Sequence, residues 1–396
     1  MSEATLMARR NLDAILLFIF CAGVFTFLIA FVSTDITVHI AHIESINANK
    51  NVYPSNFGFY LLINLLSGFS SIKGVEYVNT IMLLSVAAVA KYVISKKIIL
   101  ELNPSTFDEN KRNELKIVAL ALFFCFAIPD PFLVFVLREY YLGRFAPIVW
   151  HNSTTILVFP FAILLFWQQL NVLNTSKIAS SKEILFLNIL VVLNAIIKPS
   201  FIFVYAPVTF FFLIAKFKDT KLKVLLLNIT PIFTAVLVVF MQTFLIYKLG
   251  LGSFQKDKSS IAIGYPFKVL TQWAPMWYLP ISLILSFALP IFTLTAYKES
   301  LKYRPLLYAL SLTIAGLIIS ALFYETGPRF EHGNFIWQNV ICAYLMFLST
   351  LAFLSPKILD TTTWTYKERI VFVLLAMHVL SGLLYLIKIG QTLSYI

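Results

Sequence analysis

The sequence predicts an all-α protein that crosses a membrane several times, and three observations support this fold class. Hydrophobic residues make up 59% of the chain and charged residues only 13%, with a mean hydropathy of +0.84. A soluble domain usually carries about 25% charged residues. Several apolar stretches reach the roughly 20 residues that a helix needs to cross a bilayer. These stretches are continuous and do not alternate with a period of two, which favours helices over a β-barrel.

We therefore expect a polytopic bundle of transmembrane helices that forms one domain over residues 1–396, without a soluble domain. The first span follows Arg9 and Arg10 and is too long for a signal peptide, so we expect an uncleaved anchor with a cytoplasmic N-terminus. The segment 56–69 is shorter and amphipathic, and we expect it in the membrane interface. About eleven spans are expected. They lie near residues 12–33, 76–98, 117–137, 152–170, 183–198, 201–216, 223–247, 274–297, 305–324, 336–355 and 369–390.

The basic residues predict the orientation of the bundle. The chain has 31 Lys and Arg against 19 Asp and Glu, a net charge of +12. Most of the basic residues lie at the N-terminus and in alternate short loops, and such loops face the cytoplasm. Topology thus explains the charge, and no nucleic-acid partner is expected. The cysteines lie inside apolar spans without the spacing of a disulfide framework or a zinc site.

Asp35, His39 and His42 are the first candidate functional residues, because they follow the first span on the side opposite the lysine-rich loops. In a helix, these offsets place the three side chains within about 60° of one another around the axis. An aspartate beside a histidine is a candidate general base. The three residues could instead hold a divalent cation, and the sequence suggests no other cofactor. The structural alternative is that Asp35 caps a short interfacial helix.

Two further segments place polar residues beside spans on the same side. His151 and Asn152 could hydrogen-bond sugar hydroxyls, while Trp150 would stack on a sugar face or anchor the interface. Lys198 lies at a proline break between two short spans. There it must either extend to the interface or pair with an anion. The open N-terminus of the next helix would also favour an anion such as a lipid phosphate.

The loop 324–338 joins two spans and is rich in polar residues. Arg329 offers two parallel hydrogen bonds to a phosphate. Arg138, in another outer loop, is a further phosphate candidate, with a solvated surface charge as the alternative. The loop residues that could contact substrate hydroxyls or other polar substrate groups are Glu325, Glu331, His332 and Asn334.

Together these features resemble the GT-C superfamily of integral membrane glycosyltransferases, which use polyprenyl-phosphate-linked sugars. Members carry a catalytic acid in the first outer loop after the first span, the position that Asp35 occupies. They also tend to carry amphipathic segments in that loop, which here spans residues 34–75. Basic residues at the outer face hold the donor phosphate, a part that Lys198, Arg329 and Arg138 could play. Many members have a second acid beside the first, and none is evident beside Asp35.

The resemblance implies an inverting glycosyltransferase of the bacterial cytoplasmic (inner) membrane, with its active site facing the periplasm or exterior. Asp35 would deprotonate an acceptor hydroxyl with help from His39, and cations would stabilise the departing lipid phosphate. The implied partners are a polyprenyl-phosphate-linked sugar donor, a glycan or glycolipid acceptor of the cell envelope, and membrane lipids. Two other classes stay open. One is an extracytoplasmic O-acyltransferase, and the other is a transporter or lipid flippase, which would need paired broken helices.

Overall fold

The computed structural model describes residues 3–70, 72, 74–103, 109–130, 132–136, 144–174, 179–217, 222–248 and 260–395. Over these residues the chain is almost entirely helical, which confirms the all-α class. The helices are α1 (Glu3–Phe31), α2 (Asp35–Asn47), α3 (Gly58–Leu66), α4 (Val75–Leu102), α5 (Glu109–Phe124), α6 (Ser153–Asn174), α7 (Ser181–Ile197), α8 (Ile202–Phe217), α9 (Leu222–Tyr247), α10 (Leu279–Ser286), α11 (Ala288–Ala296), α12 (Arg304–Leu322), α13 (Trp337–Ile358) and α14 (Tyr366–Thr392). Short helical turns are η1 (Phe132–Val136), η2 (Pro199–Phe201), η3 (Leu270–Gln272), η4 (Met276–Tyr278), η5 (Lys298–Lys302), η6 (Gly327–His332) and η7 (Thr361–Thr363).

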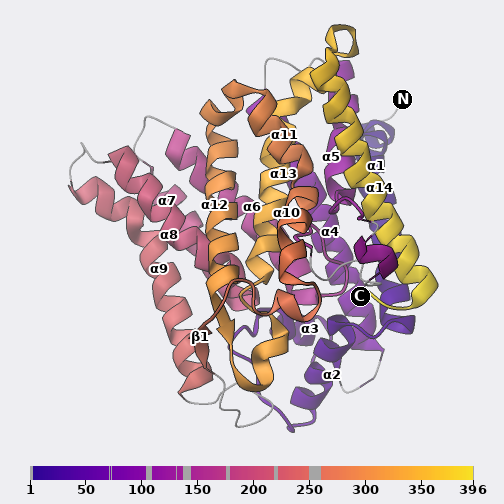
Figure 1. The fold of residues 1–396 in the computed structure, drawn as a ribbon. Helices are drawn as coiled ribbons and strands as arrows, with labels where there is room; N and C mark the ends of the chain where they lie inside the picture. The colour runs from indigo at the N-terminus through magenta and orange to yellow at the C-terminus, as the bar shows by residue number, and fades with distance from the viewer. Residues whose placement is uncertain are drawn as a thin grey trace.

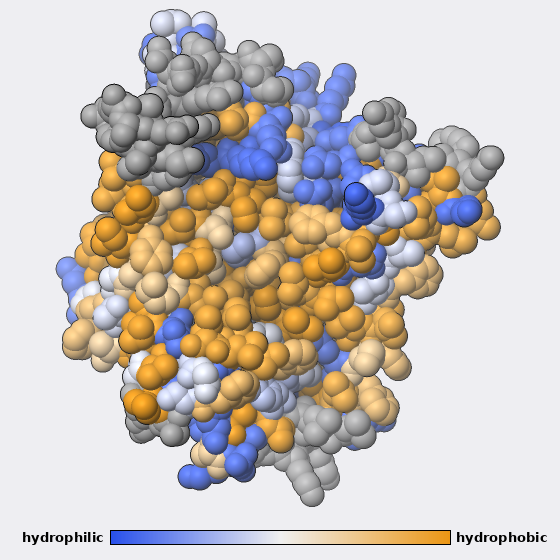
Figure 2. Space-filling model, turned by 180° about the vertical axis from the view of Figure 1, so that it is seen from behind, coloured by the Kyte–Doolittle hydropathy of each residue, from blue (hydrophilic) through white to orange (hydrophobic). Residues whose placement is uncertain are grey.

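Eight helices of the described residues are long and apolar enough to cross a membrane, and the pair α10 and α11, bent by 65°, would make nine. Two of the eleven predicted segments correspond to shorter helices, α5 with 16 residues and α7 with 17. When the bent pair is counted as one span, these two short helices account for the difference between the nine spans observed and the eleven predicted. Figure 2 shows an apolar zone across the middle of one face, between two ends where hydrophilic side chains gather. This pattern is typical of a membrane protein.

The lysine-rich end of the bundle is opposite the end that carries the first predicted loop. In Figure 1, α2, α3 and β1 (Ile261–Ile263) lie at one end, and the N-terminus lies toward the other. β1 pairs in antiparallel fashion with β2 (Phe323–Glu325), with Ile261 opposite Glu325. The polar segments that the sequence assigns to one side of the membrane therefore share one end of the fold.

α6 and α13 form the centre of the bundle. In their apolar stretches 78% and 89% of the residues are buried, against 22% in α1. Contacts between the central helices use polar groups as well as packing. Thr313 of α12 donates to the Cys342 carbonyl of α13 at 3.2 Å, and Asn339 of α13 donates to Ser320 Oγ at 2.8 Å. Such bonds are favourable between helices in lipid, because few other partners are available there.

α5 ends at Phe124, and the next residues, before Pro129, continue without regular helix. Pro129 is in keeping with this break, because proline cannot continue a helix. Backbone that leaves a helix at membrane depth needs partners within the protein. His378 of α14 supplies them, because its Nδ1 donates to the Phe126 carbonyl at 2.5 Å and its own carbonyl accepts from the Phe126 N–H at 3.0 Å.

α14 lies very close to this broken segment. Ser381 Oγ donates to the Ala127 carbonyl. One residue further along, Gly382 lies against the end of α5, where an added Cβ would lie 1.8 Å from the Phe124 carbonyl oxygen. Only glycine, which has no Cβ, allows this contact. α14 therefore supports the break through the side chains of His378 and Ser381 and through the close approach at Gly382.

Candidate functional site

Three segments that are far apart in the sequence meet through the side chain of Asn152. Its Nδ2 donates to Asp35 Oδ2 at 2.6 Å, and its Oδ1 accepts from Lys198 Nζ at 3.3 Å. Asp35 begins α2, Asn152 directly precedes α6, and Lys198 lies between α7 and η2. We call Asp35, His39, His151, Asn152 and Lys198 the acid–lysine site. All five are residues that the sequence proposed.

Asp35 is the first residue of α2 and not its cap. The N-cap is Thr34, and the hydroxyl of Thr37 accepts from the Thr34 N–H at 3.4 Å and donates to the Thr34 carbonyl at 2.8 Å. The structural alternative for Asp35, a capping role, is therefore wrong. A carboxylate in the first helical turn still gains from the helix dipole, but its side chain points to Asn152.

Asn152 is held in one orientation by its other contacts. Its Oδ1 accepts from the hydroxyl of Thr154 at 3.0 Å and from the N–H and hydroxyl of Thr155 at 3.0 and 2.8 Å. These donors fix which side-chain atom is the oxygen, and the Nδ2 group then faces Asp35. Asn152 is thus the N-cap of α6 and the link between the Asp35 carboxylate and the Lys198 ammonium.

Lys198 is buried, with 7% of its surface exposed, so it does not extend to the interface. Its Nζ donates to Thr154 Oγ1 at 3.2 Å and lies 4.6 Å from the ring centroid of Trp337. Burial lowers the pKa of Lys198 to about 8, against the favourable field of Asp35. The ion pairs of the described residues include neither Lys198 nor Asp35. Asn152 therefore keeps an acid and a cation close without letting them neutralise each other directly.

Two histidines of the site are neutral at physiological pH. His39 Nδ1 lies 2.5 Å from Ser153 Oγ, and burial lowers the pKa of His39 to about 4. His151 is buried and stacks on Tyr395, with ring centroids 4.0 Å apart. Burial likewise lowers the pKa of His151 to about 4. A neutral imidazole donates at one nitrogen and accepts at the other, which suits the recognition of hydroxyl groups.

His42 packs on the same Tyr60 ring as His39 and makes its own contact with Asn51. It is buried against the Tyr60 ring at 5.2 Å, and Asn51 Nδ2 lies 3.5 Å from its Nδ1. Within the part of the chain that the structure describes, no three His, Cys, Asp or Glu side chains come together as a metal site requires. The divalent cation on Asp35, His39 and His42 stays a prediction without a gathered ligand set.

The loop 324–338 forms a second polar cluster with its own internal partners. Arg329 Nε lies 3.0 Å from Glu325 Oε1, and Asn334 Nδ2 donates to Glu325 Oε2. The predicted phosphate ligand Arg329 is thus engaged by an acid of its own loop. Glu331 and His332 are exposed on η6. The other predicted phosphate ligand, Arg138, lies outside the described residues.

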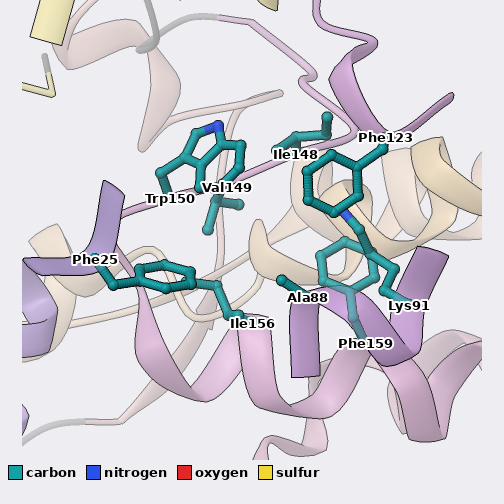
Figure 3. A pocket seen from close by; sticks show the side chains of 9 residues that line it. All are labelled: Phe25, Ala88, Lys91, Phe123, Ile148, Val149, Trp150, Ile156 and Phe159. Atoms are coloured by element: carbon teal, nitrogen blue, oxygen red, sulfur yellow. The ribbon is translucent and has the colours of Figure 1, made fainter. Parts of the chain in front are cut away.

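Trp150 is inside the bundle and not at the interface. It is 4% exposed, and its ring packs against Phe20, Phe25 and Phe123, with centroids 5.8 to 6.4 Å apart. Figure 3 shows it lining a narrow cavity together with Lys91, whose Nζ lies 4.8 Å from the Phe123 ring. Neither a sugar platform nor an interfacial anchor fits this buried position.

Three residues at the acid–lysine site were not proposed from the sequence. Ser153 contacts His39, Trp337 lies beside Lys198, and Tyr395 stacks on His151. Trp337 also ties the second cluster to the first, because its Nε1 donates to the His332 carbonyl at 3.1 Å. An aromatic residue where a polar loop enters a span was a usable signal for Trp337. Nothing in the sequence around Tyr395 indicates its contact.

Comparison with protein-family models, with curated protein sequences and with solved structures finds no match to this chain. The GT-C resemblance therefore remains a prediction carried by the residues themselves.

Proposed function

We propose that this protein is an inverting membrane glycosyltransferase of the GT-C kind, which moves a sugar from a polyprenyl-phosphate donor to a hydroxyl of an extracytoplasmic glycan or glycolipid. One observation carries the proposal: Asp35 and Lys198 share one site but are bridged by Asn152. A proton acceptor and a phosphate ligand are both needed for this reaction, and a direct ion pair would occupy both.

In this proposal the Asp35 carboxylate acts on the acceptor hydroxyl, and the Lys198 ammonium acts on the leaving phosphate. The Asp35 carboxylate takes the proton of the acceptor hydroxyl while the acceptor oxygen bonds to the anomeric carbon. The bond from that carbon to the phosphate oxygen breaks, and the lipid phosphate leaves with the electron pair. The buried Lys198 ammonium has neutral oxygens and a ring as neighbours, with no carboxylate within ion-pair distance in the described structure. An anionic phosphate would supply the negative charge that this buried ammonium would pair with.

Neutral His39 and His151 lie within the field of the same acid. In this proposal they position hydroxyl groups of the sugar or the acceptor, and they leave the proton to Asp35. Arg329 has a smaller part than the sequence suggested, because Glu325 already pairs with it. The proposal thus assigns the donor phosphate mainly to Lys198.

The test uses purified protein and a panel of polyprenyl-phosphate sugars, and it measures release of the lipid phosphate with an acceptor extract. Asp35→Asn keeps the shape of the side chain and its place beside Asn152, but it removes the base. We expect release to be lost and donor binding to remain. Glu44→Gln, on the same helix α2, is the matched control and should keep activity. Full turnover by Asp35→Asn would refute the general-base assignment, and no release with any donor would count against glycosyl transfer.

One observation favours transport as a second candidate. Broken helices that meet are typical of transporters, and here the segment after α5 contacts the bend between α10 and α11, where Ile128 N donates to the Leu285 carbonyl at 3.3 Å. The Phe126 and Ala127 carbonyls at this break are already bonded to α14. The two functions separate in proteoliposomes: movement of a fluorescent polyprenyl-phosphate lipid between leaflets that survives Asp35→Asn would favour transport.

A further inference from the structure

A second cavity lies at the opposite end of the bundle from the acid–lysine site. It has a volume of about 520 Å³ and opens between the C-terminal ends of α6 and α8 and the N-terminal part of α12. These three helices pack against one another (Figure 1). The cavity is within the size range of ligand sites, which is about 300–1,000 Å³. The sequence predicts that this lysine-rich end faces the cytoplasm.

Two cations lie at the mouth of the cavity. Lys216 is in the last turn of α8, and Arg304 is the first residue of α12. Lys216 Nζ donates to the Val172 carbonyl, and Arg304 Nη1 donates to the Leu173 carbonyl at 3.1 Å. Both cations thus meet the last turn of α6, where the carbonyl ends of the helix carry partial negative charge. None of the described residues that line the cavity is acidic.

Apart from Asn174, the remaining walls are mostly apolar. Leu170, Phe212 and Leu307 line the cavity, and Tyr308 closes it on one side. Tyr308 is fully buried, stacks on Phe166 with ring centroids 5.4 Å apart, and shares a hydrogen bond of 2.6 Å with Thr209. Helix capping alone would explain the two cations but not an apolar chamber behind them.

We propose that this cavity binds the phosphate headgroup and the upper acyl chain of an anionic phospholipid of the leaflet on the lysine-rich side. Lys216 and Arg304 would hold the phosphate, and the apolar walls would take the chain. Basic pockets between helices at the cytoplasmic end recognise anionic lipids in this way, because that leaflet is rich in them. Cationic side chains and an acyl-sized apolar space together match an amphiphile, whereas a free phosphate would use only the cations.

The test is native mass spectrometry of the detergent-solubilised chain, titrated with phosphatidylglycerol or with phosphatidylcholine of the same acyl chains. The wild-type protein should retain phosphatidylglycerol preferentially. The double variant Lys216→Gln, Arg304→Gln should bind it about thirtyfold more weakly, given the contribution of each cation near a lipid headgroup. Lys302→Gln removes an exposed charge at the same end that does not line the cavity, and it should change little.

A third variant tests the proposal without removing either cation, in case the charge variants misfold. Ala215→Phe keeps both cations but fills the chamber, so it should also reduce phosphatidylglycerol retention. Three results would overturn the proposal: equal retention of the two lipids by the wild-type protein, an equal loss in Lys302→Gln, or undiminished lipid retention in Ala215→Phe. Stabilisation by inorganic phosphate alone, with nothing added by the lipid, would overturn the lipid assignment and leave a plain phosphate site. None of these results bears on sugar transfer at the other end.

Discussion

The burial of Lys198 predicts how activity depends on pH. In the proposed reaction Lys198 would bind the donor phosphate only as an ammonium ion, and burial lowers its pKa from 10.5 to about 8. As the pH rises through 8, the protein without bound donor loses this charge, so kcat/KM for the proposed polyprenyl-phosphate donor should fall. A solvent-exposed lysine would keep its charge up to pH values beyond 10. Lys198→Arg should abolish the fall, because a guanidinium keeps its charge at every accessible pH.

The size of the effect follows from the same difference in pKa. It corresponds to roughly 3 kcal/mol in favour of the neutral amine, and the side chain is 7% exposed, so solvent screening is small. The charged fraction falls from about nine tenths at pH 7 to about one tenth at pH 9. Above pH 8, kcat/KM should then drop about tenfold per pH unit. A bound phosphate stabilises the ammonium, so the fall should be weaker in kcat, which reports the complex.

The assay is release of lipid phosphate at low donor concentration between pH 6.5 and 9.5. His39 and His151 do not complicate this range, because their pKa values of about 4 keep both neutral throughout. The control is Lys268→Arg, a lysine at the same end that bonds to Tyr324, and it should keep the wild-type fall. A flat wild-type profile up to pH 9.5 would refute the reasoning, as would an identical fall in Lys198→Arg.

Two further predictions concern residues that hold the site and the bundle together. Asn152→Asp keeps an acceptor for the α6 cap but replaces the donor to Asp35 by a second carboxylate, so kcat/KM should fall roughly ten- to a hundredfold; unaltered turnover would remove Asn152 from the site. Gly382→Ala should destabilise the protein by more than about 3 kcal/mol, because the new Cβ meets the Phe124 carbonyl at 1.8 Å. Gly390→Ala, in the same helix with nothing within 4 Å, should be neutral or stabilising. Thermal unfolding in detergent measures both, and equal midpoints for the two glycine variants would contradict the packing argument.

The sequence predicts the helical class and the polar end of this protein well, because both depend on composition. Apolar length gives the helices, and the residues that interrupt them stand out against an apolar background. Asp35, His151, Asn152 and Lys198 were selected in this way, and the structure brings them together. Glu331 and His332 were selected in the same way but are exposed on η6, so a polar residue beside a span is a candidate for the site and not always a member of it.

Other features depend on packing that no local pattern encodes. All the candidate spans are strongly apolar, so their apolarity does not tell the central α6 and α13 from the peripheral α1. The partner of Arg329 could not be predicted either, because Glu325 and Glu331 are both close in sequence and only the loop conformation selects Glu325. Trp150 shows the same limit, since an aromatic residue at the start of a span could face lipid, water or the interior.

The chemistry of the acid–lysine site depends on the one neutral residue at its centre. If Asp35 and Lys198 formed a direct pair, the acid would be a poorer base and the ammonium a poorer phosphate ligand, because each would be satisfied by the other. With Asn152 between them, the amide donates one hydrogen bond to Asp35 and accepts one from Lys198, and it is itself fixed by Thr154 and Thr155. The acid and the cation are then close enough to act on two ends of one substrate, and neither is the direct ion-pair partner of the other. An asparagine that caps a helix is an ordinary structural feature, and here the same cap sets the distance between the two charges that the proposed reaction requires.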